Sequence, residues 1–256
     1  LLNSIMVSAH DEHSLILQNK DLNDLIGQLT PEQKIGQLFL VTFEGNQLNA
    51  NSEIVDLISN HYVSGVILKR ENDNFIGPEK TLESTIDLVL ALQNTAAGLI
   101  PEKKTEKEQP TITPSVPLKN ENYIPLFIGI SQEGDSYPFD QILNGVSPLP
   151  NLMALGATWE PAEAEKVGRV MGDELHRLGF NLFIGPSLDV LDINYTSGGD
   201  DLGTRTFGGD PFWVSQMGKA YIRGVHSGSG NQMAVIAKHF PGRGGSDRLP
   251  EAEVAT

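Results

Sequence analysis

The sequence predicts an α/β protein of the (β/α)8 TIM barrel type, of which this chain is the front part. Two observations predict this fold. Short apolar runs that end in polar residues alternate with amphipathic helical stretches, a pattern typical of a parallel sheet covered by helices. About five such runs occur in 256 residues, whereas a closed barrel has eight strands in typically about 250 residues. An open sheet with the same alternation is the alternative.

The strands are expected where β-branched and aromatic residues gather between turn residues. They are 39–43, 65–68, 124–130, 180–184 and 233–237. The helices are expected where apolar residues recur three or four positions apart. They are 52–60, 81–99, 160–178 and 212–225. An earlier helix is expected to begin at Pro31, because Thr30 is a suitable N-cap and Gln33 its capping-box partner.

Two segments depart from this alternation. Residues 1–24 have no clear apolar period and are expected to form a tail or a loosely docked arm, which leaves 25–256 as the partial barrel domain. Within that domain, residues 101–123 are rich in Pro, Lys and Glu and poor in apolar side chains. Such a segment cannot bury a core, so we expect a surface insertion or linker.

Composition excludes several classes of function. The 33 acidic residues outnumber the 18 basic ones, which gives a formal net charge of -15 and disfavours a nucleic-acid partner. No stretch approaches the roughly 20 apolar residues of a membrane helix. The chain has no cysteine, which excludes disulfides, thiolate zinc sites and thiol catalysis. His10 and His13 flank two acids, but polar clusters at chain ends seldom bind metal, so no metal ion or other cofactor is predicted.

Polar side chains follow the predicted strands at the points where the strands end. They are Ser131, Glu133 and Asp135 after the third strand, Asp189 and then Arg205 after the fourth, and Lys238 and His239 after the fifth. The carboxyl ends of barrel strands meet at one mouth, where ligands bind. Lys, Arg and His supply N–H donors, and carboxylates supply acceptors, for the hydroxyls of a carbohydrate. Taken alone, a Lys-His pair is more often an ordinary polar strand end.

Six segments extend this pattern to a known family. They are 29–37, 65–68, 132–134, 187–190, 205–208 and 238–242. In their order and spacing they resemble the N-terminal catalytic domain of glycoside hydrolase family 3, in particular its β-N-acetylhexosaminidase branch. The resemblance begins at about residue 25. It implies a barrel fold and retaining hydrolysis of an O-glycosidic bond, with a carbohydrate as the partner.

The resemblance also implies roles for individual residues. Lys238 and His239 would bind the hydroxyls of the sugar at the cleavage point, and Arg205 would contact the same sugar. Asp189 would support the site from the fourth strand. The Lys-His and Phe-Pro peptide bonds of the family are often cis, so the same is expected at 238–239 and 240–241.

The chain departs from the family pattern at three places. The family usually has an aspartate where this chain has Ser131, and Glu133 or Asp135 would have to compensate for it. The hexosaminidase branch has an Asp-Ser-His element whose His is the general acid/base. The corresponding loop, 246–250, reads Ser-Asp-Arg-Leu-Pro, so only Asp247 is left as a weak candidate. The nucleophilic aspartate of the family would lie beyond Thr256.

Two hypotheses therefore stay open for the full-length parent. It is either a retaining β-N-acetylhexosaminidase or a catalytically degenerate carbohydrate-binding or scaffold domain of the same fold. In both cases this chain alone is expected to be inactive. The resemblance and the Pro-rich insertion favour an exported bacterial protein. The exact sugar, the linkage and the oligomeric state cannot be read from the sequence.

Overall fold

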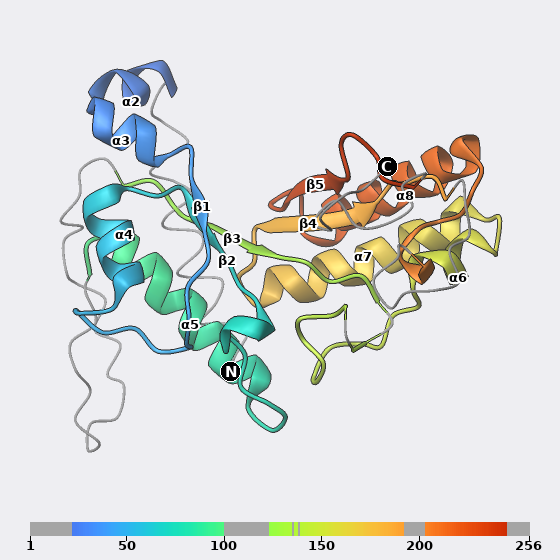
Figure 1. Ribbon diagram of the computed structural model, residues 1–256, viewed down its shortest axis with the longest axis horizontal. Coiled ribbons are helices and arrows are strands. Elements are labelled where there is room, and N and C mark those ends of the chain that lie inside the picture. Colours follow the sequence, from blue (N-terminus) through green and yellow to red (C-terminus); the bar gives the residue numbers. More distant parts are fainter. Residues whose placement is uncertain (1–21, 100–122, 135, 138, 192–202, 245–256) are drawn as a thin grey trace, which may run out of the picture.

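The computed structural model describes residues 22–99, 123–134, 136–137, 139–191 and 203–244. Within these residues five strands form one sheet in the order β1-β2-β3-β4-β5, and every neighbouring pair is parallel (Figure 1). The strands are β1 Leu40–Val41, β2 Gly65–Ile67, β3 Phe127–Ile130, β4 Leu182–Ser187 and β5 Ala234–Lys238. Strand order equal to chain order is the arrangement expected of successive βα units in a barrel.

Helices precede β1 and lie in the connections between the later strands. They are α2 Leu22–Gln28, α3 Pro31–Gly36, α4 Glu53–His61, α5 Thr81–Ala96, α6 Leu152–Gly156, α7 Pro161–Arg177 and α8 Pro211–Gly228. Two short 3-10 helices, η1 Arg70–Asn72 and η2 Gly203–Arg205, lie in the connections that follow β2 and β4. None of the helices within the described ranges combines the length and the hydropathy needed to cross a membrane.

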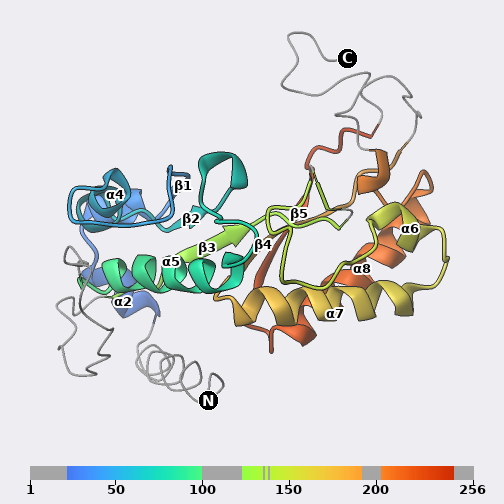
Figure 2. The same cartoon turned by 90° about the horizontal axis from the view of Figure 1, so that it is seen from below.

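The core lies between the sheet and the helices that follow its strands. Ile128 and Phe183 of neighbouring strands are almost fully buried, as are Leu92 of α5 and Leu175 of α7. Figure 2 shows α5 and α7 running along the same face of the sheet. Successive strand residues point to opposite faces, so Phe127, next to buried Ile128, lies on the other face and is 44% exposed.

The predicted helix start at Thr30 is confirmed. The Thr30 hydroxyl accepts the Gln33 backbone N–H, the Gln33 side chain accepts the Thr30 backbone N–H, and Pro31 is the first helical residue. The five strands and the four longer helices also form where apolar periodicity predicts them. Some are shorter than predicted, since β1 holds only Leu40–Val41 and α5 ends at Ala96.

The structure contains two helices, α2 and α6, that were not predicted from the sequence. Helix α2 has no buried residue, although Leu22, Leu25 and Ile26 stand at helical spacing and are a signal that the division at residue 24 overlooks. Helix α6 has five residues, too few to show an apolar period. It begins at the Asn151 cap, whose side chain accepts the Ala154 N–H.

The proposed insertion at 101–123 lies outside the described residues except for Tyr123, and so does the His10–His13 cluster. The division into a tail of 1–24 and a barrel domain stays a prediction.

Helices α7 and α8 approach each other so closely that glycine is required where they touch. A Cβ atom added to Gly172 of α7 would lie 2.3 Å from the Val225 carbonyl oxygen, and one added to Gly224 of α8 would lie 2.1 Å from the Glu165 carbonyl oxygen. These neighbours are backbone atoms of rigid helices, which cannot move aside as a side chain can. The contact holds the βα units of β3 and β4 together.

We predict that Gly172→Ala destabilises the protein. Alanine is favoured over glycine in a helix by about 1 kcal/mol, but overpacking against backbone costs about 1–3 kcal/mol and outweighs that gain. Urea unfolding followed by circular dichroism measures the change. Gly27→Ala in α2 is the matched control, because no atom lies within 4 Å of its added Cβ, and its stability should stay equal or rise. Equal stability of the two variants would show that the close helix contact is dispensable.

Candidate functional site

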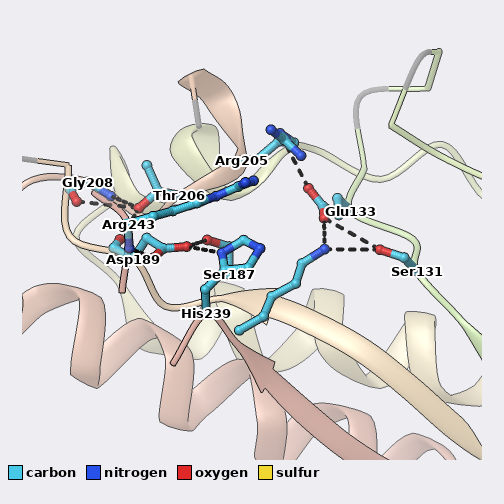
Figure 3. Close-up of polar contacts among 10 residues, drawn as sticks. Ser131, Glu133, Ser187, Asp189, Arg205, Thr206, Gly208, His239 and Arg243 are labelled. Carbon is cyan, nitrogen blue, oxygen red and sulfur yellow. Dashed lines mark hydrogen bonds and ion pairs between the residues drawn. The ribbon is translucent and has the colours of Figure 1, made fainter. Parts of the chain in front are cut away.

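Side chains from three strand ends lie together at the carboxyl edge of the sheet (Figure 3). Glu133 follows β3, Asp189 follows β4, Lys238 is the last residue of β5, and His239 comes next. Arg205 ends the short helix η2 in the connection between β4 and α8. Because all strands run parallel, residues that follow them along the chain arrive at the same edge.

Glu133 is a buried carboxylate held between two cations. Lys238 Nζ donates to Glu133 Oε1 and also to Ser131 Oγ, the latter at 3.1 Å. Arg205 Nε lies 3.8 Å from Glu133 Oε2, and the Glu133 side chain is only 4% exposed. A buried charge is tolerated only when it is paired, so these contacts explain how a carboxylate can occupy this position. The Arg205 guanidinium also lies over the Phe139 ring, 4.4 Å from its centroid.

The backbone of the Glu133 segment is held by Asp140. The buried Asp140 carboxylate accepts the backbone N–H groups of Glu133, Gly134 and Ser136 at 2.8, 2.9 and 3.0 Å. Burial raises the pKa of Asp140 above its ordinary value, although these three donors favour the ionised form. Gly134 has a φ of +79°, and an added Cβ would lie 2.6 Å from the Pro150 carbonyl oxygen. This turn directs the Glu133 side chain into the cluster.

Gln132 has a structural role in the same segment. Its side-chain oxygen accepts the backbone N–H groups of Gln141 and Ile142, and its side-chain nitrogen donates to the Ile142 carbonyl at 2.9 Å. The three residues of the Gln-Glu-Gly motif therefore have two different roles. Gln132 and Gly134 shape the turn, and Glu133 alone contributes its side chain to the cluster.

Asp189 and His239 form the second part of the cluster. Asp189 Oδ2 lies 2.6 Å from His239 Nδ1 and accepts the Ser187 hydroxyl at 2.8 Å, while Oδ1 accepts the Arg243 backbone N–H at 2.7 Å. Burial opposes ionisation of Asp189, but these three hydrogen bonds outweigh it and hold the pKa of this carboxyl below its ordinary value. An ionised Asp189 places the imidazole proton on Nδ1. Nε2 points away from Asp189 (Figure 3) and is the hydrogen-bond acceptor of the neutral imidazole.

The structure brings together five of the residues that the sequence singled out: Glu133, Asp189, Arg205, Lys238 and His239. Asp135 and Asp247 lie outside the described residues. The peptide bonds Lys238–His239 and Phe240–Pro241 are both cis, as expected from the family resemblance.

Sequence reasoning missed the roles of Arg243 and Asp140. The flanking glycines were a usable signal for Arg243, since a Cβ at Gly244 would lie 1.7 Å from the Val190 carbonyl oxygen. Glycine at such a position indicates a close approach of two backbone segments, here the two that carry Asp189 and Arg243. Asp140 gives no comparable signal, because its partners are backbone groups several residues away.

Comparison with known proteins identifies the family. The glycosyl hydrolase family 3 N-terminal domain matches residues 30–256 of the chain. The chain belongs to glycosyl hydrolase family 3. A beta-hexosaminidase of Thiobacillus denitrificans is 34% identical over 126 residues, which cover 47% of this chain and 33% of that protein. A beta-N-acetylglucosaminidase/beta-glucosidase of Cellulomonas fimi is 31% identical over 131 residues, covering 51% of this chain and 22% of that protein.

Solved structures agree with the partial barrel. A family 3 β-N-acetylglucosaminidase from a Paenibacillus species is 29% identical, with a TM-score of 0.67 over 86% of this chain and 35% of that chain. A β-N-acetylhexosaminidase from Beutenbergia cavernae, 24% identical, has the same fold with a TM-score of 0.64 over 86% of this chain and 56% of that chain. The predicted fold class is therefore confirmed: this family 3 chain is part of an α/β barrel. It spans about a third or less of the length of the two curated relatives described above.

We predict that Asp189→Asn destabilises the protein at neutral pH and that the difference from wild type shrinks in acid. The pKa of Asp189 is lower in the folded protein than its ordinary 3.8. Its ionised form therefore contributes stability above about pH 4, and this contribution is lost as pH falls through the folded pKa. Urea unfolding of both proteins from pH 7 down to about pH 3 measures the difference. A difference that does not change with pH would contradict a charged Asp189 in the fold.

Proposed function

We propose that the whole protein is a retaining β-glycoside hydrolase that acts on β-linked N-acetylhexosamine. The observation that carries this proposal is the convergence of Lys238, His239 and Arg205 around Glu133 at the carboxyl edge of the sheet. The N–H groups of Lys238 and Arg205 as donors, with the His239 Nε2 as an acceptor, suit the hydroxyls and the acetamido group of such a sugar. The names of the beta-hexosaminidase relatives support the same substrate class.

The side chains of the site would share the binding of one sugar. Lys238 and Arg205 donate hydrogen bonds, and Glu133 keeps both cations in place. His239, with its proton on Nδ1 toward Asp189, accepts a hydroxyl proton at Nε2. Asp189 has a lowered pKa and is ionised at neutral pH, so it orients the imidazole and does not act as a general acid.

Bond cleavage needs two further groups. Retaining glycosidases use a nucleophile and an acid/base on opposite sides of the glycosidic bond. Glu133 and Asp189 are both committed to fixed partners, which suits support and not proton or glycosyl transfer. We assign the nucleophile to an aspartate on a later strand of the whole protein, and Asp247 in the loop 246–250 is the candidate for the acid/base.

A specific observation favours a second candidate, a degenerate carbohydrate-binding domain. Ser131 stands where the family usually has a sugar-binding aspartate, and its hydroxyl contacts Lys238. The loop 246–250 contains no histidine. A protein that has lost both groups would keep the fold and a sugar site without the chemistry.

An assay of the whole protein separates the two candidates. We expect turnover of a chromogenic β-N-acetylglucosaminide, with a chromogenic β-glucoside as the comparison substrate. If neither chromogenic substrate is turned over, the hydrolase proposal is wrong. Binding of N-acetylglucosamine, measured by saturation-transfer NMR, would then support the degenerate domain.

In an active protein, Lys238→Ala is expected to lower kcat/KM about 100-fold, because it removes a charge-assisted hydrogen bond worth roughly 1.5–3 kcal/mol and frees Glu133 to move. Steady-state kinetics on the same substrate measures the effect, and circular dichroism checks that the variant is folded. Lys166→Ala is the matched control, because Lys166 is exposed on α7 and pairs only with Glu163 in the described contacts. A folded Lys238→Ala variant with wild-type kinetics would remove Lys238 from the site.

A further inference from the structure

Three aromatic side chains gather on the surface near the segment that carries Arg205. The Trp159 and Trp213 rings meet edge to face with their centroids 5.1 Å apart, and the Phe212 and Trp213 rings do the same at 5.5 Å. Trp159 is 57% exposed and Phe212 is 61% exposed. Single exposed apolar side chains need no explanation, whereas a group of them in contact is typical of a binding surface. We call these three residues the aromatic cluster.

The backbone of Trp159 has a conformation that is unfavourable for so large a residue. Its φ is +56°, in the left-handed region that glycine and asparagine adopt more readily. The exposed ring and the left-handed backbone both raise the free energy of the folded state. Costs of this kind collect at functional sites, so Trp159 suits a binding role better than a purely structural one.

The aromatic cluster comes from two turns at the carboxyl edge of the sheet. A helix that returns the chain to the start of the next parallel strand runs opposite to the strands, so it begins at their carboxyl edge. Helices α7 and α8 both connect parallel strands in this way. Trp159 stands two residues before Pro161, the first residue of α7, and Phe212 and Trp213 lie in the first turn of α8.

A backbone contact joins the aromatic cluster to the segment that carries Arg205. A Cβ added to Gly156, the last residue of α6, would lie 1.8 Å from the Phe207 carbonyl oxygen. The Trp159 N–H donates to the Gly156 carbonyl at 3.1 Å. On the other side, the chain runs from Phe207 directly into α8, which begins at Pro211. The segment with Arg205 is therefore flanked by the two elements that carry the aromatic rings.

The surroundings of the aromatic cluster favour a neutral sugar chain as its ligand. Thr158, Glu160 and Asp210 come from the same two turns and are exposed, and their oxygens accept hydrogen bonds from hydroxyls. The two carboxylates and the net charge of -15 disfavour nucleic acid and anionic membranes. Sugars of the glucose configuration in β-linkage carry their substituents equatorially. Their faces therefore present C–H groups, which pack on the electron-rich faces of aromatic rings.

We propose that the aromatic cluster binds the second and later sugars of a neutral β-linked oligosaccharide while one sugar occupies the site around Lys238. The inference rests on the proposed function, because it takes that site as the place where one sugar binds. Trp159 and Phe212 pack against sugar faces, and Trp213 holds both rings in place through its edge-to-face contacts. The substrate is accordingly a chain of neutral sugars, and its affinity grows with its length.

The dependence of turnover on chain length in the whole protein tests the proposal. The substrates are β-linked N-acetylglucosamine oligomers of two to five sugars. We expect kcat/KM to rise about 10-fold from the dimer to the pentamer, through a lower KM, because distant sugars are bound equally in the ground state and the transition state. Equal values of kcat/KM for all lengths would overturn the proposal.

Variants locate the length dependence in the aromatic cluster. Trp159→Ala and Phe212→Ala are each expected to reduce the pentamer-to-dimer ratio of kcat/KM at least 5-fold, mainly by raising KM for the pentamer, whereas Trp159→Phe keeps an aromatic face and should retain most of the ratio. Leu90→Ala is the matched control, because Leu90 is 46% exposed on α5 in a different βα unit. A ratio unchanged in both alanine variants of the cluster would contradict the assignment.

Unfolding separates a ligand surface from a surface that another part of the protein covers. Trp159→Asn should leave the midpoint of urea unfolding equal or higher, since asparagine adopts the left-handed conformation more readily, and it should still reduce the length ratio. If a protein segment packs on the cluster instead, the same variant would lower the midpoint and leave the ratio unchanged. That result would overturn the proposal.

The length preference is measurable even if the hydrolase proposal is wrong. Without turnover, isothermal titration calorimetry with N-acetylglucosamine and its pentamer gives the relative affinities. Binding of the pentamer about 10-fold tighter or more, lost in Trp159→Ala, would support the role of the aromatic cluster although the protein is no hydrolase. Turnover without any effect of chain length would do the reverse, and no binding of either sugar would overturn both proposals.

Discussion

The buried pairing of Glu133 with Lys238 and Arg205 is the interaction on which the rest of the site depends. It joins the segment after β3, the connection before α8 and the end of β5. Removing one partner of a buried ion pair leaves an uncompensated charge, which costs about 3–5 kcal/mol. The same contacts that position the sugar-binding groups therefore also tie three βα units together, so binding geometry and stability are coupled at this point.

Some side chains of the site hold other groups in position, and those other groups face a ligand. Asp140 holds the backbone of Glu133, and Asp189 holds both the His239 ring and the Arg243 backbone. These carboxylates are buried and serve the protein, whereas the cations and the imidazole edge that they position are the groups offered to a ligand. This division explains why the described cluster suits the binding of a ligand more directly than bond cleavage.

The elements that sequence reasoning could predict are those with an internal period or a local signal. The apolar runs of β3 and β4 and the capping box at Thr30 are of this kind, and the structure confirms them. Helix α2 is short and buries nothing, so packing does not fix its bounds, although Leu22, Leu25 and Ile26 recur at helical spacing. Among the site residues, Lys238 ends β5, Glu133 follows β3 and both match family motifs, which is why they could be singled out. The glycines beside Arg243 indicate a close backbone approach, but its partner Asp189 lies 54 positions earlier and could not be named from the sequence.

The sequence by itself determined the alternation of strands and helices, the order of the polar strand ends and the family resemblance. Each of these is written in neighbouring residues or in short motifs, so no knowledge of distant contacts is needed. Only the tertiary structure decided which charges neutralise one another. Lys238 contacts Ser131 across 107 positions and Glu133 across 105, and the parallel register of β3, β4 and β5 brings these residues to one edge. The physical reason is that ion pairing depends on distance in space, which strand register and burial set and which spacing along the chain does not.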